Sequence, residues 1–314
     1  MIVIAGPTAS GKTALAIALA KEVGGEIISA DSMQIYRNMD IGTAKPSLEE
    51  REGVPHHLID IIEPDAPFSV VHFKERAEAC IKAVLSRGRI PIIAGGTGLY
   101  INALAYNLTF SESTGNEAFR KEMQALALEK GSIFLYEKLK DVDPKGALAI
   151  HPNNVVRVIR ALEVYEATQR PISEHREESR LVPPPYDYRL FALTLDRTVL
   201  YDRIEHRVDI MIEKGLFEEV RKLLNAGFSP ELQSMQAIGY KECIAALENQ
   251  ISKEEAIAAI KLGTRHYAKR QITWFKKLEG INWLDSDKTD LRAMIKILTD
   301  NLNNPGSFSK MRAD

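Results

Sequence analysis

Residues Gly6-Pro-Thr-Ala-Ser-Gly-Lys-Thr13 follow the pattern G-x-x-x-x-G-K-[ST]. The apolar run 2–5 before them is typical of a buried strand, and the alanine- and leucine-rich run 14–22 after them predicts a helix. Between a strand and a helix, such glycines let backbone N–H groups converge on phosphate oxygens, and the helix N-terminus adds a partial positive charge. The stretch therefore predicts a phosphate-binding loop (P-loop) that begins an α/β fold.

Strand and helix patterns continue to alternate over the first hundred residues. Residues 26–29 and 90–94 are apolar runs of strand length, and residues 73–87 have helical spacing between them. Residues 188–195 have the pattern of a further strand, and residues 281–284 that of a last edge strand. This order favours a parallel sheet with right-handed crossovers.

Between the predicted strands at 90–94 and 188–195, the chain beyond residue 110 shows helical patterns alone, and this stretch ends in a proline-rich linker. The predicted helices of the chain beyond residue 110 are 117–129, 132–141, 155–168, 202–226, 234–249 and 253–277. We therefore predict an α/β fold, a P-loop nucleotide-kinase-like parallel sheet with a helical insertion domain. The core would comprise residues 1–112 and 187–300, and the insertion residues 113–186.

The composition is that of an ordinary globular protein, with 45% hydrophobic and 27% charged residues. No apolar run approaches the roughly 18 residues needed to cross a bilayer, so we expect no membrane partner. The two cysteines, Cys80 and Cys243, cannot form a disulfide framework, and we expect buried free thiols in a reducing cytosol. The net charge of −2 means that any polyanion must be held by a local basic patch.

Within the loop, Lys12 would neutralise the outer phosphates, and the Thr13 hydroxyl would ligate Mg²⁺. The strand at 90–94 ends in glycines, not in the aspartate that P-loop hydrolases use to hold magnesium through water. The chain also lacks the Asn-Lys-x-Asp signature of guanine recognition. Both observations argue against a GTPase and leave kinases and other transferases.

Two further segments follow predicted strands and should lie at the same edge of the sheet. Asp31 either faces the bound phosphates or caps a helix that begins at Ser32. Gly95-Gly-Thr-Gly98 either brings amides and the Thr97 hydroxyl to the crevice or forms only a tight turn. The residues alone leave both alternatives open.

The stretch 261–278 contains six Lys or Arg residues and no acid. At helical spacing Arg265, Lys269 and Lys276 share one face, with aromatic residues between them, which is either a solvated face or an RNA-binding stripe. Arg157 and Arg160 form a second basic pair on a predicted helix of the insertion.

Several blocks of the chain closely resemble the tRNA dimethylallyltransferases, and the resemblance extends from Ile2 to about Trp283. The blocks are Gly6–Thr13, Ala30-Asp-Ser-Met-Gln-Ile-Tyr-Arg37, Met39-Asp-Ile-Gly-Thr-Ala-Lys-Pro46, His56-His-Leu-Ile-Asp60, Ala94-Gly-Gly-Thr-Gly-Leu-Tyr100, Arg157-Val-Ile-Arg-Ala-Leu-Glu-Val164, Gln236-Ala-Ile-Gly-Tyr-Lys-Glu242 and Lys269-Arg-Gln-Ile-Thr-Trp-Phe275.

This resemblance implies a reaction in which dimethylallyl diphosphate gives its five-carbon group to N6 of the adenosine 3′ of the anticodon. It implies that the P-loop holds the diphosphate with Mg²⁺, and that the helical insertion grips the anticodon stem-loop of the tRNA. It also implies a cytoplasmic enzyme of bacterial type, since the zinc finger of some eukaryotic members is missing. Nothing in the sequence demands more than a monomer.

The resemblance also implies roles for individual residues. Asp31 would be the general base, assisted in catalysis by Thr97 and Lys12. Arg207 would reach the diphosphate, although a surface arginine paired with Glu205 or Asp209 is the alternative. The diphosphate site would comprise Gly6, Pro7, Thr8, Ala9, Ser10, Gly11, Lys12, Thr13 and Arg207. The tRNA contacts would comprise Asp31, Ser32, Met33, Gln34, Thr97, Arg120, Arg157, Arg160, Gln236, Gly239, Lys269, Arg270, Gln271, Trp274 and Lys276.

Three rival functions share parts of this pattern. A prenyltransferase for free AMP, ADP or ATP would need neither the insertion nor the basic helix. A small-molecule kinase would need an arginine-rich lid, which the sequence does not display. A non-catalytic RNA-binding protein would leave Asp31 and Thr97 without a purpose.

Overall fold

The computed structural model describes residues 1–108 and 116–303 and divides into two compact units. The first unit comprises Met1–Asn102 and the chain from Tyr186 onward, and the second comprises Ala103–Pro185. The predicted domain boundary between residues 112 and 113 lies outside the described residues.

A six-stranded sheet forms the centre of the first unit, in the order β3-β2-β4-β1-β5-β6. All pairings are parallel, and β1 lies between β4 and β5, with Ile4 opposite Ala94 and Phe191. The strands are β1 (Ile2–Ala5), β2 (Gly25–Ser29), β3 (His56–His57), β4 (Ile90–Gly95), β5 (Arg189–Thr194) and β6 (Asn282–Asp285). The predicted parallel α/β fold is confirmed, and only β3, two residues long, was not predicted.

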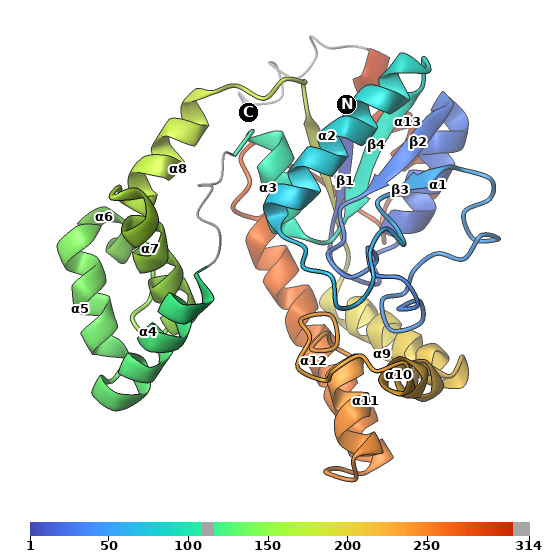
Figure 1. Cartoon of the computed structure of the whole chain (residues 1–314). Helices are drawn as coiled ribbons and strands as arrows, with labels where there is room; N and C mark the ends of the chain where they lie inside the picture. The colour runs from blue at the N-terminus through green and yellow to red at the C-terminus, as the bar shows by residue number, and fades with distance from the viewer. Residues whose placement is uncertain (109–115, 304–314) are drawn as a thin grey trace. The chain divides into compact units, whose positions relative to one another are not determined.

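Helices cover both faces of this sheet (Figure 1). On one face α1 (Lys12–Val23) and α13 (Leu291–Asn303) share a core with β1, in which Ile4, Leu19 and Leu298 are fully buried. The other face is covered by α2 (Val70–Ser86). Each fully buried aliphatic side chain stabilises the fold by about 1.5–3 kcal/mol. The sheet is therefore a rigid support for the loops at its edge.

Four helices complete the first unit, namely α9 (Arg197–Glu213), α10 (Leu216–Asn225), α11 (Tyr240–Leu247) and α12 (Lys253–Phe275). The prediction of one helix over 202–226 is wrong, because Gly215 at φ 94° separates α9 from α10. The prediction over 234–249 places the start too early, because Gly239 at φ 98° precedes α11. These φ values suit glycine and are incompatible with a continuous helix.

The second unit is helical and has a hydrophobic core of its own. A short helix α3 (Gly98–Ala105) leads into it, and its helices are α4 (Glu117–Lys130), α5 (Ser132–Val142), α6 (Pro144–Leu148), α7 (Val155–Thr168) and α8 (Ile172–Leu181). Leu135 and Leu139 of α5 pack with Val158 and Ile159 of α7. Helices α4, α5 and α7 are the three that the sequence predicts here.

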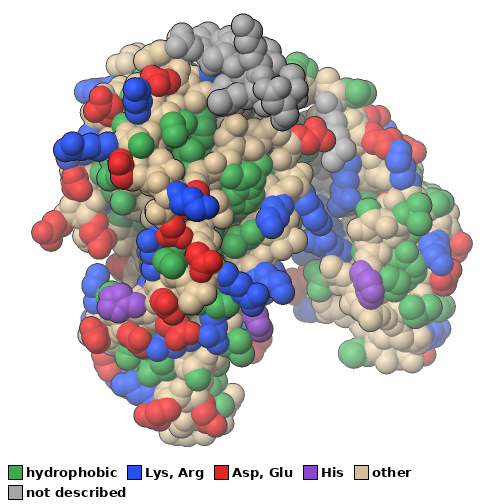
Figure 2. All heavy atoms as spheres, turned by 180° about the vertical axis from the view of Figure 1, so that it is seen from behind, with side chains coloured by type: hydrophobic (Ala, Val, Ile, Leu, Met, Phe, Trp, Pro, Cys, Tyr) green, Lys and Arg blue, Asp and Glu red, His purple; other side chains and the backbone are tan. Residues whose placement is uncertain are grey.

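Charged side chains of both signs are interspersed over the face shown in Figure 2, in keeping with the small net charge. Within the described part of the chain, no helix is both long and apolar enough to cross a membrane. Both cysteines are free thiols, but only Cys243 is buried, whereas Cys80 on α2 is half-buried, so the expectation of two buried thiols is wrong for Cys80.

Candidate active site

The P-loop connects β1 to α1. Gly6 has φ 145°, and a Cβ atom there would lie 3.1 Å from the Ser10 Oγ and 3.2 Å from the Leu193 backbone nitrogen. Gly11, with φ 91°, is the N-cap of α1 and offers no side chain to the first turn of that helix. The first-turn N–H groups are thus available to an anionic ligand.

Two cations lie beside this loop. The Lys12 Nζ donates to the Pro7 carbonyl oxygen at 2.6 Å, and the Arg207 Nη1 of α9 donates to the Thr8 Oγ1 at 3.4 Å. Burial, together with the positive charge of Arg207, lowers the pKa of Lys12 to about 7. Burial also lowers the pKa of Arg207 from its usual value. Both groups are poorly solvated cations that an anion would stabilise.

The neighbours of Arg207 on α9 are paired with α12. Glu205 forms an ion pair with Arg265 at 2.6 Å, and Asp209 forms one with Lys261 at 2.6 Å. The alternative in which Arg207 pairs with one of these acids is therefore wrong. The basic stripe on α12 is also shorter than the sequence indicates, because Glu205 on α9 neutralises Arg265.

Asp31 lies two residues after the end of β2. Its Oδ1 accepts the backbone N–H groups of Met33 at 2.8 Å and Gln34 at 3.3 Å. No helix begins at Ser32, so the alternative of a helix cap is wrong, and the carboxylate stabilises a turn instead. Among the described residues, no group donates a hydrogen bond to Asp31 Oδ2, which leaves that oxygen for a ligand.

The glycine segment after β4 packs against the approach to Asp31. A Cβ atom on Gly95 would lie 2.2 Å from the Ala30 carbonyl oxygen, so only glycine fits this contact. The Thr97 Oγ1 accepts the Ser32 N–H at 3.0 Å and donates to the Ser32 Oγ at 3.3 Å. Thr97 thus holds the Asp31 turn in place.

Helix α12 contributes three side chains around this segment. The Gln271 amide accepts the Thr8 N–H at 2.9 Å and donates to the Gly96 carbonyl at 3.0 Å, so it joins the P-loop to the glycine segment. Trp274 packs against Gly98, where a Cβ atom would lie 2.2 Å from its ring. One turn before Gln271 lies Tyr267, whose pKa is raised to about 12 by burial and by the nearby Asp31 charge.

Tyr267 was not among the predicted site residues. Its spacing from Gln271, four residues along one helix, places both side chains on one face and could have indicated it.

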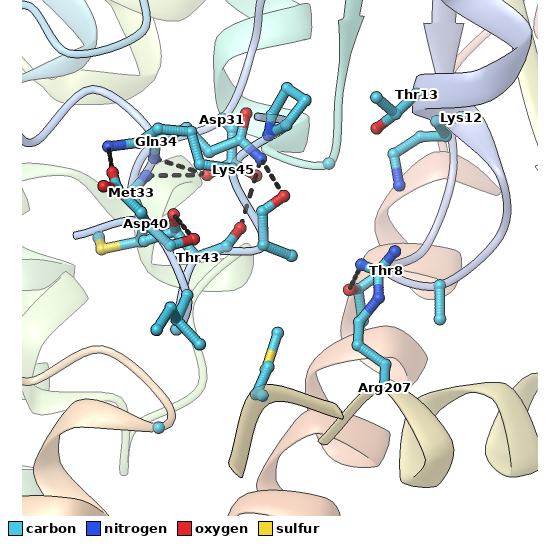
Figure 3. Close-up of a pocket in the computed structure, with 18 of the residues that line it drawn as sticks. Thr8, Lys12, Thr13, Asp31, Met33, Gln34, Asp40, Thr43, Lys45 and Arg207 are labelled. Carbon is cyan, nitrogen blue, oxygen red and sulfur yellow. Dashed lines mark hydrogen bonds and ion pairs between the residues drawn. The ribbon is translucent and has the colours of Figure 1, made fainter. Parts of the chain in front are cut away.

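Many of these residues line one cavity of about 1440 Å³, and its lining belongs entirely to the first unit. Figure 3 shows its two sides. We call the side formed by Thr8–Thr13 and Arg207 the donor wall, and the side formed by Asp31–Gln34 and residues 40–45 the acceptor wall.

The cavity brings many of the predicted site residues together. Those that line it are Thr8, Ala9, Ser10, Gly11, Lys12, Thr13, Asp31, Ser32, Met33, Gln34, Arg207, Gln236, Gly239, Arg270 and Gln271. Those of the first unit that lie outside its lining are Gly6, Pro7, Thr97, Lys269, Trp274 and Lys276.

The three predicted arginines of the insertion lie in the second unit. Glu163 on α7, only 1% exposed, binds Arg120 at 2.8 Å and Arg160 at 2.6 Å. It also accepts the N–H of Asn116. Arg157 is exposed and has no ion pair with any described residue.

The donor wall suits the expected Mg²⁺. In the described part of the chain, no cluster of three or more His, Cys, Asp or Glu side chains could hold a metal ion. The exposed Thr13 hydroxyl lines the cavity and makes no hydrogen bond to any described residue. Magnesium commonly takes few protein ligands and completes its shell with substrate phosphates and water, so these residues fit the ion.

A loop of P-loop sequence between β1 and α1 of a parallel sheet, lining one cavity with the carboxylate of Asp31 two residues beyond β2, is the arrangement of a P-loop-type α/β enzyme. The family model described as IPP transferase matches residues 34–278. The chain belongs to this family, the tRNA dimethylallyltransferases.

Individual relatives agree with this assignment. The tRNA dimethylallyltransferase of Acetivibrio thermocellus is 55% identical over 290 residues, which cover 92% of this chain and 93% of the relative. The crystal structure of the full-length tRNA isopentenylpyrophosphate transferase from Bacillus halodurans matches with a TM-score of 0.73 and 43% identity, covering 100% and 99% of the two chains. A eukaryotic dimethylallyltransferase acting on tRNA matches with a TM-score of 0.83 and 33% identity, covering 97% of this chain and 79% of the other.

Proposed function

We propose that this chain transfers the dimethylallyl group from dimethylallyl diphosphate to N6 of the adenosine 3′ of the anticodon in tRNA, releasing diphosphate. The observation that carries this proposal is the shared cavity, which both the P-loop residues of the donor wall and Asp31 of the acceptor wall line. A donor diphosphate and an acceptor nucleobase could meet there.

On the donor wall, the allylic carbon–oxygen bond breaks and negative charge develops on the leaving diphosphate. Lys12, Arg207 and the N–H groups at the start of α1 would bind those oxygens, and one such oriented donor commonly accelerates a reaction about a hundredfold or more. Thr13 and the diphosphate would hold Mg²⁺, which supplies further neutralisation of that charge when it is bound.

On the acceptor wall, the new bond forms between the allylic carbon and N6 of the adenine. The Asp31 Oδ2 would accept the proton that N6 loses, while Oδ1 keeps its hydrogen bonds to the turn. Ser32, Met33, Gln34, Gln236, Gly239 and Arg270 line the same cavity and would contact the bases around the target.

The remaining predicted tRNA contacts would lie on surfaces beyond the cavity. Lys269 on α12 and Lys276, the C-cap of that helix, are exposed and have no ion pair among the described residues, so they suit RNA phosphates. Arg120, Arg157 and Arg160 would hold the anticodon stem-loop from the second unit.

Radiolabelled dimethylallyl diphosphate, Mg²⁺ and either unmodified tRNA or AMP test this function. We expect label in the tRNA and none in AMP. Label in AMP alone would instead assign the free-nucleotide reaction, and transfer of a labelled γ-phosphate from ATP would assign a kinase. We further propose that the enzyme is cytoplasmic and that it is a monomer. Size-exclusion chromatography with light scattering tests the oligomeric state by measuring the mass in solution.

A further inference from the structure

Glu219, on α10, receives hydrogen bonds from three successive backbone amides of the acceptor wall. Its Oε2 accepts the N–H groups of Asp40 at 2.9 Å and Ile41 at 2.8 Å, and its Oε1 accepts that of Gly42 at 3.1 Å. Hydrogen bonds to an ionised acceptor are roughly twice as strong as neutral ones. The carboxylate therefore fixes a segment that lies 177–179 residues away in the chain.

Tyr240, the first residue of α11, completes this arrangement. Its hydroxyl donates to the Glu219 Oε1 at 2.6 Å, and the residue is 0% exposed. Its ring lies against Gly42, where a Cβ atom would approach within 2.4 Å, so the segment is held by close packing as well. Burial and the Glu219 charge raise the pKa of Tyr240 well above its usual value, so the hydroxyl stays a donor.

The fixed segment in turn orients Gln34. The Gln34 Nε2 donates to the carbonyls of Thr43 and Ala44, both at 3.3 Å, and its Oε1 accepts from the Ser29 Oγ at 3.3 Å. Because two carbonyls surround the nitrogen, the amide cannot be turned over without losing both bonds. The remaining lone pair of the amide oxygen can accept one more hydrogen bond, and because Gln34 lines the cavity, a nucleobase amino group could donate it.

Lys45 anchors the far end of the same segment. Its Nζ binds Asp40 Oδ1 and Asp60 Oδ1, each at 2.5 Å, and donates to the Tyr36 carbonyl at 2.8 Å. Segment 40–44 is thus fixed by Lys45 and its partners at the C-terminal end and by Glu219 of α10 and Tyr240 of α11 at the N-terminal end.

We infer that Glu219 and Tyr240 are positioning residues for the RNA acceptor: they hold segment 40–44 so that its carbonyls fix the Gln34 amide beside Asp31, ready to receive a nucleobase amino group. This inference rests on the proposed function. According to this inference, the geometry of the Asp31–Gln34 turn depends on α10 and α11, although neither helix contributes a residue to that turn.

The test compares Glu219→Gln with Glu218→Gln, a matched control whose carboxylate is exposed and, among the residues that the structure describes, pairs only with Arg221. In Glu219→Gln an NH₂ group replaces one of the two carboxylate oxygens, so at least one of the backbone N–H groups of residues 40–42 loses its acceptor. We expect Glu219→Gln to raise the KM for tRNA about tenfold and to leave the KM for dimethylallyl diphosphate within about twofold of wild type. Tyr240→Phe should raise the KM for tRNA about threefold, and Glu218→Gln should change neither constant.

A double-mutant cycle with Gln34→Ala separates positioning from general support, because coupled residues are non-additive. If Glu219 acts through Gln34, adding Glu219→Gln to Gln34→Ala should raise the KM for tRNA no further. Additive effects, or equal rises in both KM values with a lowered thermal midpoint, would overturn the inference. Wild-type protein that transfers no label to tRNA would instead refute the proposed function.

Discussion

The two walls of the cavity differ in how well their polar groups are satisfied. On the donor wall, the Ser10 hydroxyl is buried without a partner among the described residues, and Lys12 and Arg207 each make one hydrogen bond to a neutral oxygen. On the acceptor wall, Gln34 bonds through both ends of its amide, and Lys45 contacts two carboxylates.

This difference indicates two ways of preparing a site. Half-buried cations that form no ion pair with any described residue disfavour the ligand-free fold and are stabilised when an anion arrives. A network that is already satisfied keeps its shape before the ligand arrives and loses little order on binding. Removing a cation from the donor wall should therefore lower ligand affinity and raise the stability of the free protein. Variants of the acceptor wall should lose function with no gain in stability.

The largest effect is expected for Asp31→Asn on the acceptor wall. An asparagine oxygen can still accept the N–H groups of Met33 and Gln34, so the turn should persist, but the amide is no base for the N6 proton. We expect the single-turnover rate at saturating substrates to fall about 10³-fold and the Kd for tRNA to stay within about threefold. A rate loss below about tenfold would restrict Asp31 to its role in the turn.

The next effect is expected for Lys12→Met on the donor wall, which should weaken diphosphate binding about a hundredfold. Because its pKa is about 7, Lys12 loses its proton above neutral pH, and an anion must restore it. Wild-type affinity should thus fall up to about tenfold per pH unit above 7 from this group alone. Calorimetry in buffers of different ionisation enthalpy should detect proton uptake by wild type that is absent from the variant.

The same substitution should raise stability in the absence of ligand. The folded pKa of Lys12, about 7, lies below the 10.5 of an unfolded lysine, so the unfolded chain binds more protons between those values. The free energy of unfolding of the wild type should then rise with pH between 7 and 10.5, and the destabilisation caused by burying the charged Lys12 should be greatest below pH 7. Lys12→Met should raise the thermal midpoint most at pH 7 and little near pH 10. A lower midpoint at pH 7 would contradict the contrast between the walls.

The sequence predicts the donor wall better than the acceptor wall, for a physical reason. The eight P-loop residues are contiguous, and their pattern alone specifies glycines, a lysine and a hydroxyl at fixed positions. Glu219 and Tyr240 reach the acceptor wall from far along the chain, and no local periodicity indicates that contact.

The same limit explains the errors on α12 and within the sheet. The acids that neutralise Arg265 and Lys261 lie on α9, so the charge run looked unpaired from its own helix. Strand β3 has two residues, too few for an alternating pattern. Contacts between distant segments decided each of these features.

The smallest effect is expected for Glu163→Gln, which extends the comparison to the second unit. Like the acceptor wall, this carboxylate is satisfied: burial opposes its charge, but hydrogen bonds from Arg120, Arg160 and the Asn116 N–H outweigh burial and lower its pKa. Glutamine keeps one acceptor oxygen and places its NH₂ group either against Arg160 and the Arg120 Nη2 or against the Arg120 Nε and the Asn116 N–H, so the guanidinium groups should lose a fixed orientation. We expect the Kd for tRNA to rise about threefold to fivefold, with the rate at saturating tRNA unchanged.

Glu166→Gln is the control, because Glu166 lies three residues further along α7 and is exposed, so the variant makes the same charge change without touching the arginines. If Glu163 acted only through its negative charge, Glu163→Gln would make the surface more positive and tighten tRNA binding, and Glu166→Gln would do the same. Weaker binding by Glu163→Gln beside unchanged or tighter binding by Glu166→Gln would show that a satisfied network, here as on the acceptor wall, contributes orientation and not net charge.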